Sequence, residues 1–193
     1  PRNPSRPPYS ELFLTEYRLA QMRRMRRITA WVKGELARLA ESRSGEIERG
    51  FITHRTLADP RWLDPAVEPN NRAPGQSYLG DPRVVNNGPV GLARFSTLLA
   101  WLSQWSVEDS RADGVRNAAR ISAPLLAIEN GADDAVPQQH VPRVFAAAAS
   151  MDKQFARIEQ ANHYYAGQPD QMNEAASLID RWLLDRGLAG AGQ

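Results

Sequence analysis

Residues Ile121–Pro137, which read ISAPLLAIENGADDAVP, decide the fold of the second half of this chain. Leu125–Ile128 is a short apolar run that follows Pro124, and the pair Asp133-Asp134 comes shortly after it. A short apolar run bounded by turn residues is typical of a buried strand. The stretch therefore predicts a strand that ends in an acidic turn.

The same pattern occurs once more, closer to the C-terminus. Phe155–Ile158 predicts a second strand, and the turn Ala161–Tyr165 that follows it carries His163. Between the two strands, the alanine-rich segment Val141–Ala149 predicts a helix. This order describes a βαβ unit of a parallel sheet, in which both loops lie at the edge where ligands bind. An acid and a histidine brought together there suit a general base and the carboxylate that orients it.

The acidic turn resembles that of the α/β-hydrolases, whose triad runs Ser, then Asp or Glu, then His along the chain. The family's turn is typically Gly-x-x-Asp, with Val-Pro completing it four residues after the Asp. This spacing puts Asp133 in the acid position, four residues before Pro137. Asn130 stands in place of the usual first glycine and Gly131 is displaced by one residue, so Asp134 remains a rival.

The histidine turn of the family is commonly a small residue, any residue and then His, and Ala161-Asn162-His163 has this form. The resemblance implies that His163 is a general base and that Asp133 holds its imidazole. It covers Ile121–Leu184 well. The Gly-x-Ser-x-Gly nucleophile turn and the oxyanion loop of this fold are absent from the chain, and the similar stretch Gly75–Gly80 has the wrong spacing.

The resemblance implies an α/β fold: the C-terminal portion of an α/β-hydrolase sheet at residues 111–193, preceded by a mainly helical cap at residues 10–110. Residues 1–9 contain four prolines and are expected to form a linker or a processed end. The missing nucleophile would then belong to an N-terminal polypeptide, either a separate chain or another part of the same precursor. We expect this chain to be inactive without that polypeptide.

The expected cap begins with the longest periodic segment of the chain, from Ser10 to about Ala40. Its apolar residues recur at spacings of three and four, and Ser10 predicts the N-cap. We expect this helix, straight or broken near Gly34, to cover the active-site edge of the sheet; a packing arm for another chain is the alternative. Phe51–Leu57 predicts a short strand, and the proline-dense segment from there to Gly88 predicts an irregular loop.

Two further apolar stripes predict helices at Pro89–Trp105 and Asp170–Leu184. The packing face expected for the second of these helices is Met172, Ala176, Ile179, Trp182 and Leu183. Trp101, Trp105 and Tyr164 are the candidates for lining a substrate pocket. For the two tryptophans, which are four residues apart, core packing is the alternative.

Composition narrows the classes of function. The chain has 193 residues and no cysteine, which excludes disulfides and thiolate metal sites, and its three histidines lack ligand spacing. We therefore expect no metal and no cofactor. No apolar run approaches the roughly 20 residues that span a bilayer, so no membrane span is expected. No signal peptide opens the sequence, and the cytoplasm is the favoured compartment.

Positive charge is concentrated in the first third of the chain. Pro1–Trp62 contains 13 Lys or Arg against 7 Asp or Glu, whereas the remainder contains 11 against 15. The arginines alternate with apolar residues at helical spacing. We therefore interpret them as a solvated helix face, and we expect no nucleic-acid partner.

These features together predict a hydrolase that acts on a small-molecule ester, thioester or amide through a Ser-His-Asp triad. One alternative keeps the fold and changes the chemistry to that of a dehalogenase, an epoxide hydrolase or a carbon–carbon bond hydrolase. Another alternative is a non-catalytic interaction protein. In that case Asp133 and His163 would lie far apart or in ordinary packing.

Overall fold

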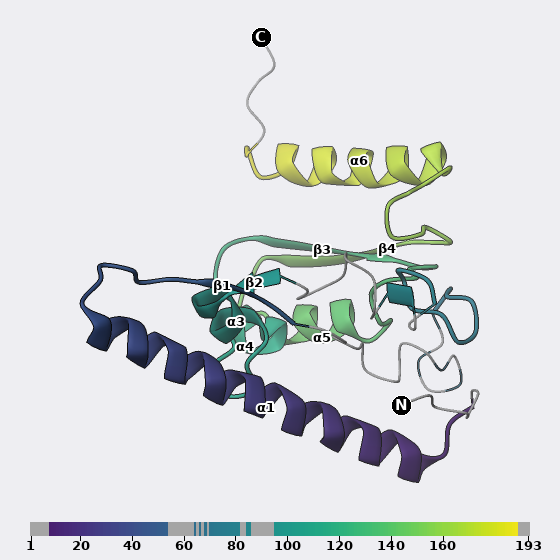
Figure 1. Cartoon of the computed structure of the whole chain (residues 1–193). Helices are drawn as coiled ribbons and strands as arrows, with labels where there is room; N and C mark the ends of the chain where they lie inside the picture. Colours follow the sequence, from purple (N-terminus) through teal and green to yellow (C-terminus); the bar gives the residue numbers. More distant parts are fainter. Residues whose placement is uncertain are drawn as a thin grey trace. The chain divides into compact units, whose positions relative to one another are not determined.

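The computed structural model is a mixed α/β protein (Figure 1). It describes residues 8–53, 64, 66, 68, 70–81, 84–85 and 95–188. These residues form two compact units, the first from Pro1–Val67 and Ala73–Asp113, the second from Glu68–Arg72 and Gly114–Gln193. The division after Asp113 lies close to the predicted boundary at 110. The segment Glu68–Arg72, which was predicted as part of the cap, belongs to the second unit.

The first unit is built on α1 (Glu11–Ser42), a helix of 32 residues. The Ser10 hydroxyl caps it by accepting a hydrogen bond from the Phe13 backbone N–H at 3.2 Å. The predicted helix and its N-cap are thereby confirmed, and the helix continues through Gly34 without a break. It ends at Arg43, whose backbone turns into the left-handed region at φ 51°.

A short antiparallel ribbon and a second helix follow in the first unit. β1 (Gly50–Ile52) pairs with β2 (Phe95–Thr97), and α3 (Leu98–Gln104) continues directly from β2. The predicted helix Pro89–Trp105 is wrong for the residues of β2, because these pair with β1. The Thr97 hydroxyl then caps α3, accepting from a backbone N–H of its first turn at 3.3 Å. The part of that prediction before β2 lies outside the described residues.

The strand and the irregular loop that were predicted after α1 are confirmed in part. The strand predicted at Phe51–Leu57 is observed at Gly50–Ile52, and the residues after Thr53 in that prediction lie outside the described part. Residues 70–81 form turns, with one isolated bridge between Ser77 and Gly80.

The core of the first unit lies along one face of α1. Its buried residues are Val32, Leu39, Leu98 and Trp101, with Met25, Ile28, Leu36, Phe51, Leu102 and Trp105 packed against them. The Trp101 side chain is 0% exposed, and its indole N–H donates to the Thr29 hydroxyl at 3.2 Å. Such a partner allows an indole to be fully buried. Trp101 and Trp105 therefore pack in this core, which is the alternative named for them above.

Replacing Trp101 with alanine should lower the free energy of unfolding by about 3–5 kcal/mol, because a fully buried ring is lost and a cavity remains. Urea unfolding followed by circular dichroism measures this change. The matched control is Leu99→Ala, on the same helix but 51% exposed, which should change stability by about 0.5 kcal/mol or less. Equal effects of the two substitutions would contradict the proposed core.

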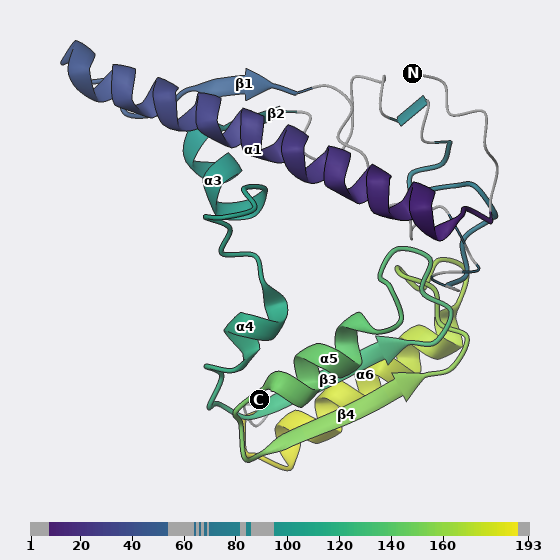
Figure 2. The same cartoon turned by 90° about the horizontal axis from the view of Figure 1, so that it is seen from below.

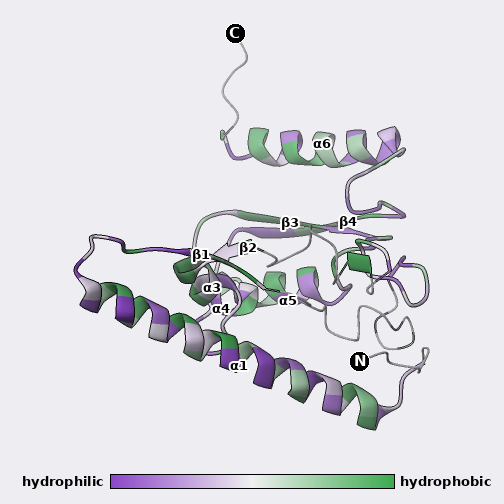
Figure 3. Ribbon diagram, viewed as in Figure 1, coloured by the Kyte–Doolittle hydropathy of each residue, from purple (hydrophilic) through white to green (hydrophobic). Residues whose placement is uncertain are grey.

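The charged face of α1 meets carboxylates of its own unit. Apolar and charged residues alternate along this helix (Figure 3). Arg26 Nε lies 2.6 Å from Glu108 Oε1, and Lys33 Nζ lies 2.8 Å from Asp109 Oδ2. Both pairs are exposed, so they contribute little to stability. They agree with the interpretation of this face as a solvated helix surface.

The second unit has three layers, with a helix on each face of a small sheet. β3 (Leu125–Asn130) pairs in parallel with β4 (Lys153–Ile158), and the two strands run in the same direction in Figure 2. α5 (His140–Ala147) connects the strands on one face, and α6 (Pro169–Leu184) covers the other face (Figure 1). The short helix α4 (Gly114–Ala118) precedes β3. The predicted βαβ unit and closing helix are confirmed.

α6 packs with a face that differs from the predicted one. Ala175 is 5% exposed and, with Leu178, packs against Ile158 of the sheet. Met172 and Ile179 were predicted to face the core but are 52% and 42% exposed. The small Ala175 allows the helix to approach the strand closely, and this directs the neighbouring apolar stripe away from the sheet.

Coverage of the sheet is thin in the described residues. Glu129 is the one buried residue of β3, Ala175 is the one buried residue of α6, and α5 has none.

Among the described residues, no helix combines the length and the apolar character that crossing a bilayer requires.

Candidate active site

The candidate site lies at the carboxyl ends of β3 and β4. The strand register places Asn130 opposite Ile158, so the turns that follow the two strands start side by side. The Gly131 N–H donates to the Ile158 carbonyl at 2.8 Å, and the Ala132 N–H donates to the Ala161 carbonyl at 2.9 Å. The acidic turn and the histidine turn are thus joined backbone to backbone.

Asp133 and His163 meet where these turns adjoin. His163 Nδ1 lies 3.1 Å from Asp133 Oδ2, and the two side chains are 28% and 12% exposed. The other carboxylate oxygen of Asp133 accepts from the backbone N–H groups of Ala135 and Val136, each at 2.7 Å. One oxygen therefore fixes the acid in its turn while the other faces the imidazole. The contact predicted for this pair is present, and the catalytic roles of both residues stay a prediction.

The carboxylate of Asp134, the rival acid, interacts electrostatically with Arg72. Burial lowers the pKa of Arg72, and the carboxylates of Glu68 and Asp134 oppose that change. Arg72 and Glu68 are 8% and 7% exposed. The segment that carries them also contacts the acidic turn, since the Asn71 N–H donates to the Asp133 carbonyl at 3.4 Å. No sequence pattern predicted this segment at the site, because it comes from a proline-rich loop with no periodicity.

Asn130, at the position where the family has glycine, ties the two turns together. Its side-chain Nδ2 donates to the Asn162 carbonyl at 2.9 Å, and its Oδ1 accepts from the Tyr165 hydroxyl at 2.8 Å. The Asn162 N–H donates to the Gln168 side chain at 2.7 Å. The residue directly before His163 is therefore held at both its carbonyl and its N–H. A polar amide at the end of an apolar strand was the signal that could have revealed this role.

Gly131 is required by the close approach of the two turns. A Cβ at this position would lie 3.1 Å from the Gln160 backbone nitrogen and 3.1 Å from the Ile158 carbonyl oxygen. Both neighbours are backbone atoms, so neither can move aside without disturbing the turn. This explains why a glycine occurs here although the family pattern expects it one residue earlier.

Gly131→Ala should therefore destabilise the protein by about 1–3 kcal/mol, as expected for overpacking. Gly34→Ala is the matched control, because a Cβ there meets no atom within 4 Å and alanine stabilises a helix by about 0.5–1 kcal/mol over glycine. Urea unfolding of the two variants should show shifts of opposite sign. A neutral Gly131→Ala variant would show that the turns are farther apart than described.

Of the three candidates for substrate contact, Tyr164 lies at this site. Its side chain is 70% exposed, and its ring meets that of His163 edge-on, with centroids 4.6 Å apart. Trp101 and Trp105 belong to the core of the first unit instead. In the described part of the chain, the hollow beside Asp133 measures about 10 Å³, which is room for about one water molecule. A substrate pocket at this site needs further walls.

Comparison of the chain with models of protein families, with curated proteins and with solved structures finds no match. Within the described residues, no three His, Cys, Asp or Glu side chains are grouped so that they could hold a metal ion. The class that fold and site define is a mixed α/β protein with an Asp–His pair at the carboxyl ends of parallel strands. The resemblance to the α/β-hydrolases is a hypothesis that depends on this geometry and on the order of the two turns.

Proposed function

We propose that this chain is the C-terminal part of an α/β-hydrolase that acts on a small-molecule ester, thioester or amide. The observation that carries the proposal is the 3.1 Å contact between His163 Nδ1 and Asp133 Oδ2. In a serine-type triad, the carboxylate holds the imidazole in the tautomer with its proton on Nδ1, and the other ring nitrogen takes the proton of the nucleophile. Asp133 has the anchoring that this role needs, because two backbone N–H groups fix its second oxygen.

The reaction follows from these roles. His163 removes the proton of a serine hydroxyl as that hydroxyl attacks the substrate carbonyl, and it then donates the proton to the leaving group. Water, activated by the same imidazole, hydrolyses the acyl-enzyme. Backbone N–H groups that stabilise the tetrahedral intermediate complete such a site. In this proposal the serine and the oxyanion donors belong to an N-terminal polypeptide, and the first unit acts as a cap.

The second unit itself supports the need for such a partner. Its described sheet has two parallel strands, whereas parallel sheets are stable when neighbouring strands and helices bury both faces. On α6, Met172 and Ile179 are 52% and 42% exposed, and α5 has no buried residue. The hollow of about 10 Å³ beside Asp133 also leaves no room for a substrate. Additional strands from the partner would supply both the missing contacts and the pocket walls.

The test uses the assembled protein, in which this chain is joined by the polypeptide that completes it. It should hydrolyse a p-nitrophenyl ester and react covalently with a fluorophosphonate probe. Peptide mass spectrometry should locate the label on a serine outside residues 1–193. Residues 1–193 alone should be inactive. A soluble, monomeric and fully active product of residues 1–193 would contradict the proposal, as would an assembled protein that neither turns over the ester nor takes the label.

A further inference from the structure

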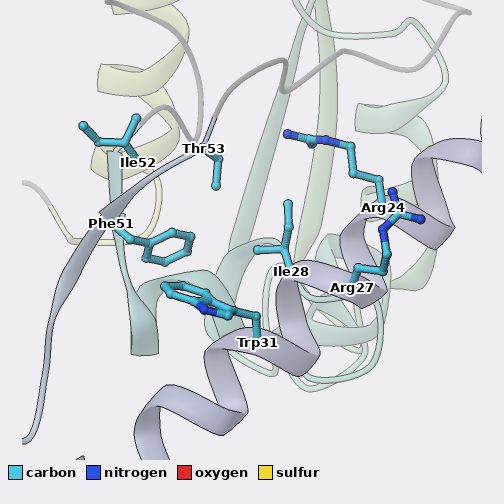
Figure 4. A pocket seen from close by; sticks show the side chains of 7 residues that line it. All are labelled: Arg24, Arg27, Ile28, Trp31, Phe51, Ile52 and Thr53. Atoms are coloured by element: carbon cyan, nitrogen blue, oxygen red, sulfur yellow. The ribbon is translucent and has the colours of Figure 1, made fainter.

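Hollows lined by described residues occur in both units of the chain. The first unit has an open hollow of about 620 Å³, with the rings of Trp31 and Phe51 on one side of it (Figure 4). Its described lining contains neither Asp133 nor His163, which belong to the second unit. In the second unit, Asn130 is among the residues that line the hollow of about 10 Å³ beside Asp133. Asn130 is also bonded to both turns of the Asp–His pair.

His163 lies in a short turn, Asn162–Tyr165, which is closed by its first and last residues. The Tyr165 N–H donates to the Asn162 carbonyl at 3.3 Å. The Asn162 side chain is bonded to the backbone of Ala166, accepting from its N–H at 2.9 Å and donating to its carbonyl at 3.0 Å. A closed four-residue turn fixes the backbone of the two residues between its ends. The direction of the His163 side chain therefore depends on how the two ends are held.

The side-chain amide of Asn130 holds both ends of this turn. Its Nδ2 donates to the Asn162 carbonyl at 2.9 Å, and its Oδ1 accepts from the Tyr165 hydroxyl at 2.8 Å. A carbonyl can only accept, so one orientation of the amide satisfies both partners. The Asn130 backbone carbonyl accepts from the Asp133 N–H at 3.2 Å and thereby closes the acidic turn. One residue thus connects the turn of the acid with the turn of the histidine.

Tyr165 reaches Asn130 from a backbone conformation that is uncommon for a residue with a side chain. Its φ is 54°, in the left-handed region that mainly glycine adopts. Its ring packs against the buried cluster around Ile158, and its carbonyl accepts from the Gln168 N–H at 3.0 Å. An unfavourable φ persists only where the surrounding structure fixes it, and such residues are concentrated at functional sites. The packing of the ring therefore sets the place of the hydroxyl that bonds to Asn130.

We propose that Asn130 and Tyr165 are positioning residues, which together hold the imidazole of His163 at the carboxylate of Asp133. The kinetic part of this proposal rests on the proposed hydrolase function, because both residues act through His163. The family pattern has a glycine where this chain has Asn130, and a glycine makes neither of the two side-chain bonds. The clamp is therefore a property of this chain and goes beyond what the family pattern implies.

Asn130→Gly restores the family's glycine and should nevertheless lower kcat of the assembled protein by about 10²-fold. The reason is that a displacement of a reacting group by about 1 Å costs a factor of this order. Asn130→Ala, which lacks the backbone freedom of glycine, should lose as much. Tyr165→Phe removes the hydroxyl alone and should lower kcat about five- to tenfold, as expected for one hydrogen bond. KM for the p-nitrophenyl ester should stay within about twofold in all three, since the defect concerns the reaction step.

The two residues should be coupled. Once Asn130 is replaced, the Tyr165 hydroxyl has lost the partner through which it acts. The double variant Asn130→Ala/Tyr165→Phe should therefore have the kcat of Asn130→Ala and not the product of the two losses.

Leu178→Ala is the control for a purely structural effect. Leu178 packs against the same buried cluster as Tyr165, but it belongs to α6 and to neither turn. Its replacement should lower the urea midpoint at least as much as Tyr165→Phe does, because a partly buried side chain leaves a cavity. The kcat of the folded variant should change by about threefold or less.

A spectroscopic measurement decides the positioning without any turnover. ¹⁵N NMR of the assembled protein, labelled with ¹⁵N-histidine, reports which ring nitrogen of a neutral imidazole carries the proton, and His163→Gln identifies the signals of this residue. A carboxylate held at Nδ1 keeps the proton on that nitrogen. In Asn130→Ala and Tyr165→Phe the population with the proton on Nε2 should rise, whereas Leu178→Ala should match the parent.

The proposal is overturned if Asn130→Ala keeps the parental tautomer, if the two losses in kcat multiply, or if Leu178→Ala lowers kcat as much as Tyr165→Phe does. A change confined to KM would overturn it as well. An assembled protein that hydrolyses no ester would refute the hydrolase function instead. In that case the tautomer of His163 in the same variants still decides whether Asn130 and Tyr165 position it.

Discussion

Replacing His163 with alanine in the assembled protein should lower kcat by on the order of 10³ or more. The imidazole lies 3.1 Å from the Asp133 carboxylate and is the group expected to take the proton of the nucleophile. Without it, the serine hydroxyl remains protonated and attacks slowly. Steady-state hydrolysis of a p-nitrophenyl ester measures the loss, and covalent labelling by the fluorophosphonate should slow in parallel.

His140→Ala is the matched control for this prediction. His140 is exposed at the start of α5. Its removal should change kcat by about threefold or less, within the range of neutral surface substitutions. His54, which lies outside the described residues, is expected to tolerate the same change. Near-normal turnover by His163→Ala would favour the non-catalytic alternative, in which the contact with Asp133 is ordinary packing.

The βαβ unit could be predicted because its local patterns and its tertiary structure agree. The apolar run that begins at Leu125 and the one that includes Phe155 each end in a polar turn. A helix between two strands is the usual crossover between parallel neighbours, so the order of the elements predicts a parallel pair. The helix prediction failed at Phe95–Thr97, because the apolar stripe of α3 extends back into these residues, which form a strand. There the pairing with β1 overrides local periodicity, and partners distant in sequence give no local signal.

The Asp–His pair could also be predicted, whereas the residues that position it could not. Asp133 and His163 were visible because each follows a strand at a defined distance. Asn130 holds the histidine turn through two hydrogen bonds, yet in the sequence it was only a departure from a glycine pattern. Arg72 was hidden for a different reason, since the contact of its segment with the acidic turn depends on how a proline-rich loop folds back.

The packing face of α6 shows where periodicity alone is ambiguous. The helix has two apolar stripes, one through Ala175 and Leu178 and another through Met172 and Ile179. The first packs on the described sheet, and the second is exposed. The predicted packing face contained Met172 and Ile179 of the second stripe. If the proposed partner packs on this second stripe, both stripes have a structural purpose.

Asp133→Asn should lower kcat by on the order of 10³–10⁴, far more than Asp134→Asn. The two backbone N–H groups of Ala135 and Val136 require an acceptor, so the amide oxygen of the new asparagine takes their side. Its NH₂ group then faces His163 Nδ1, which must become the acceptor. The imidazole proton consequently moves to Nε2, the nitrogen that has to remove a proton from the nucleophile.

Asp134→Asn leaves these contacts in place, because Asp133 makes them, whereas the carboxylate of Asp134 interacts electrostatically with Arg72. We expect its kcat to stay within about threefold of the parent, with a small loss of stability from weaker compensation of the buried guanidinium. KM should remain nearly unchanged in Asp133→Asn, since the tautomer matters for the reaction and not for substrate binding. Ester hydrolysis by both variants of the assembled protein, with urea unfolding alongside, separates these effects. The reverse ranking would mean that the displaced Gly131 shifts the acidic turn by one residue and makes Asp134 the acid of the triad.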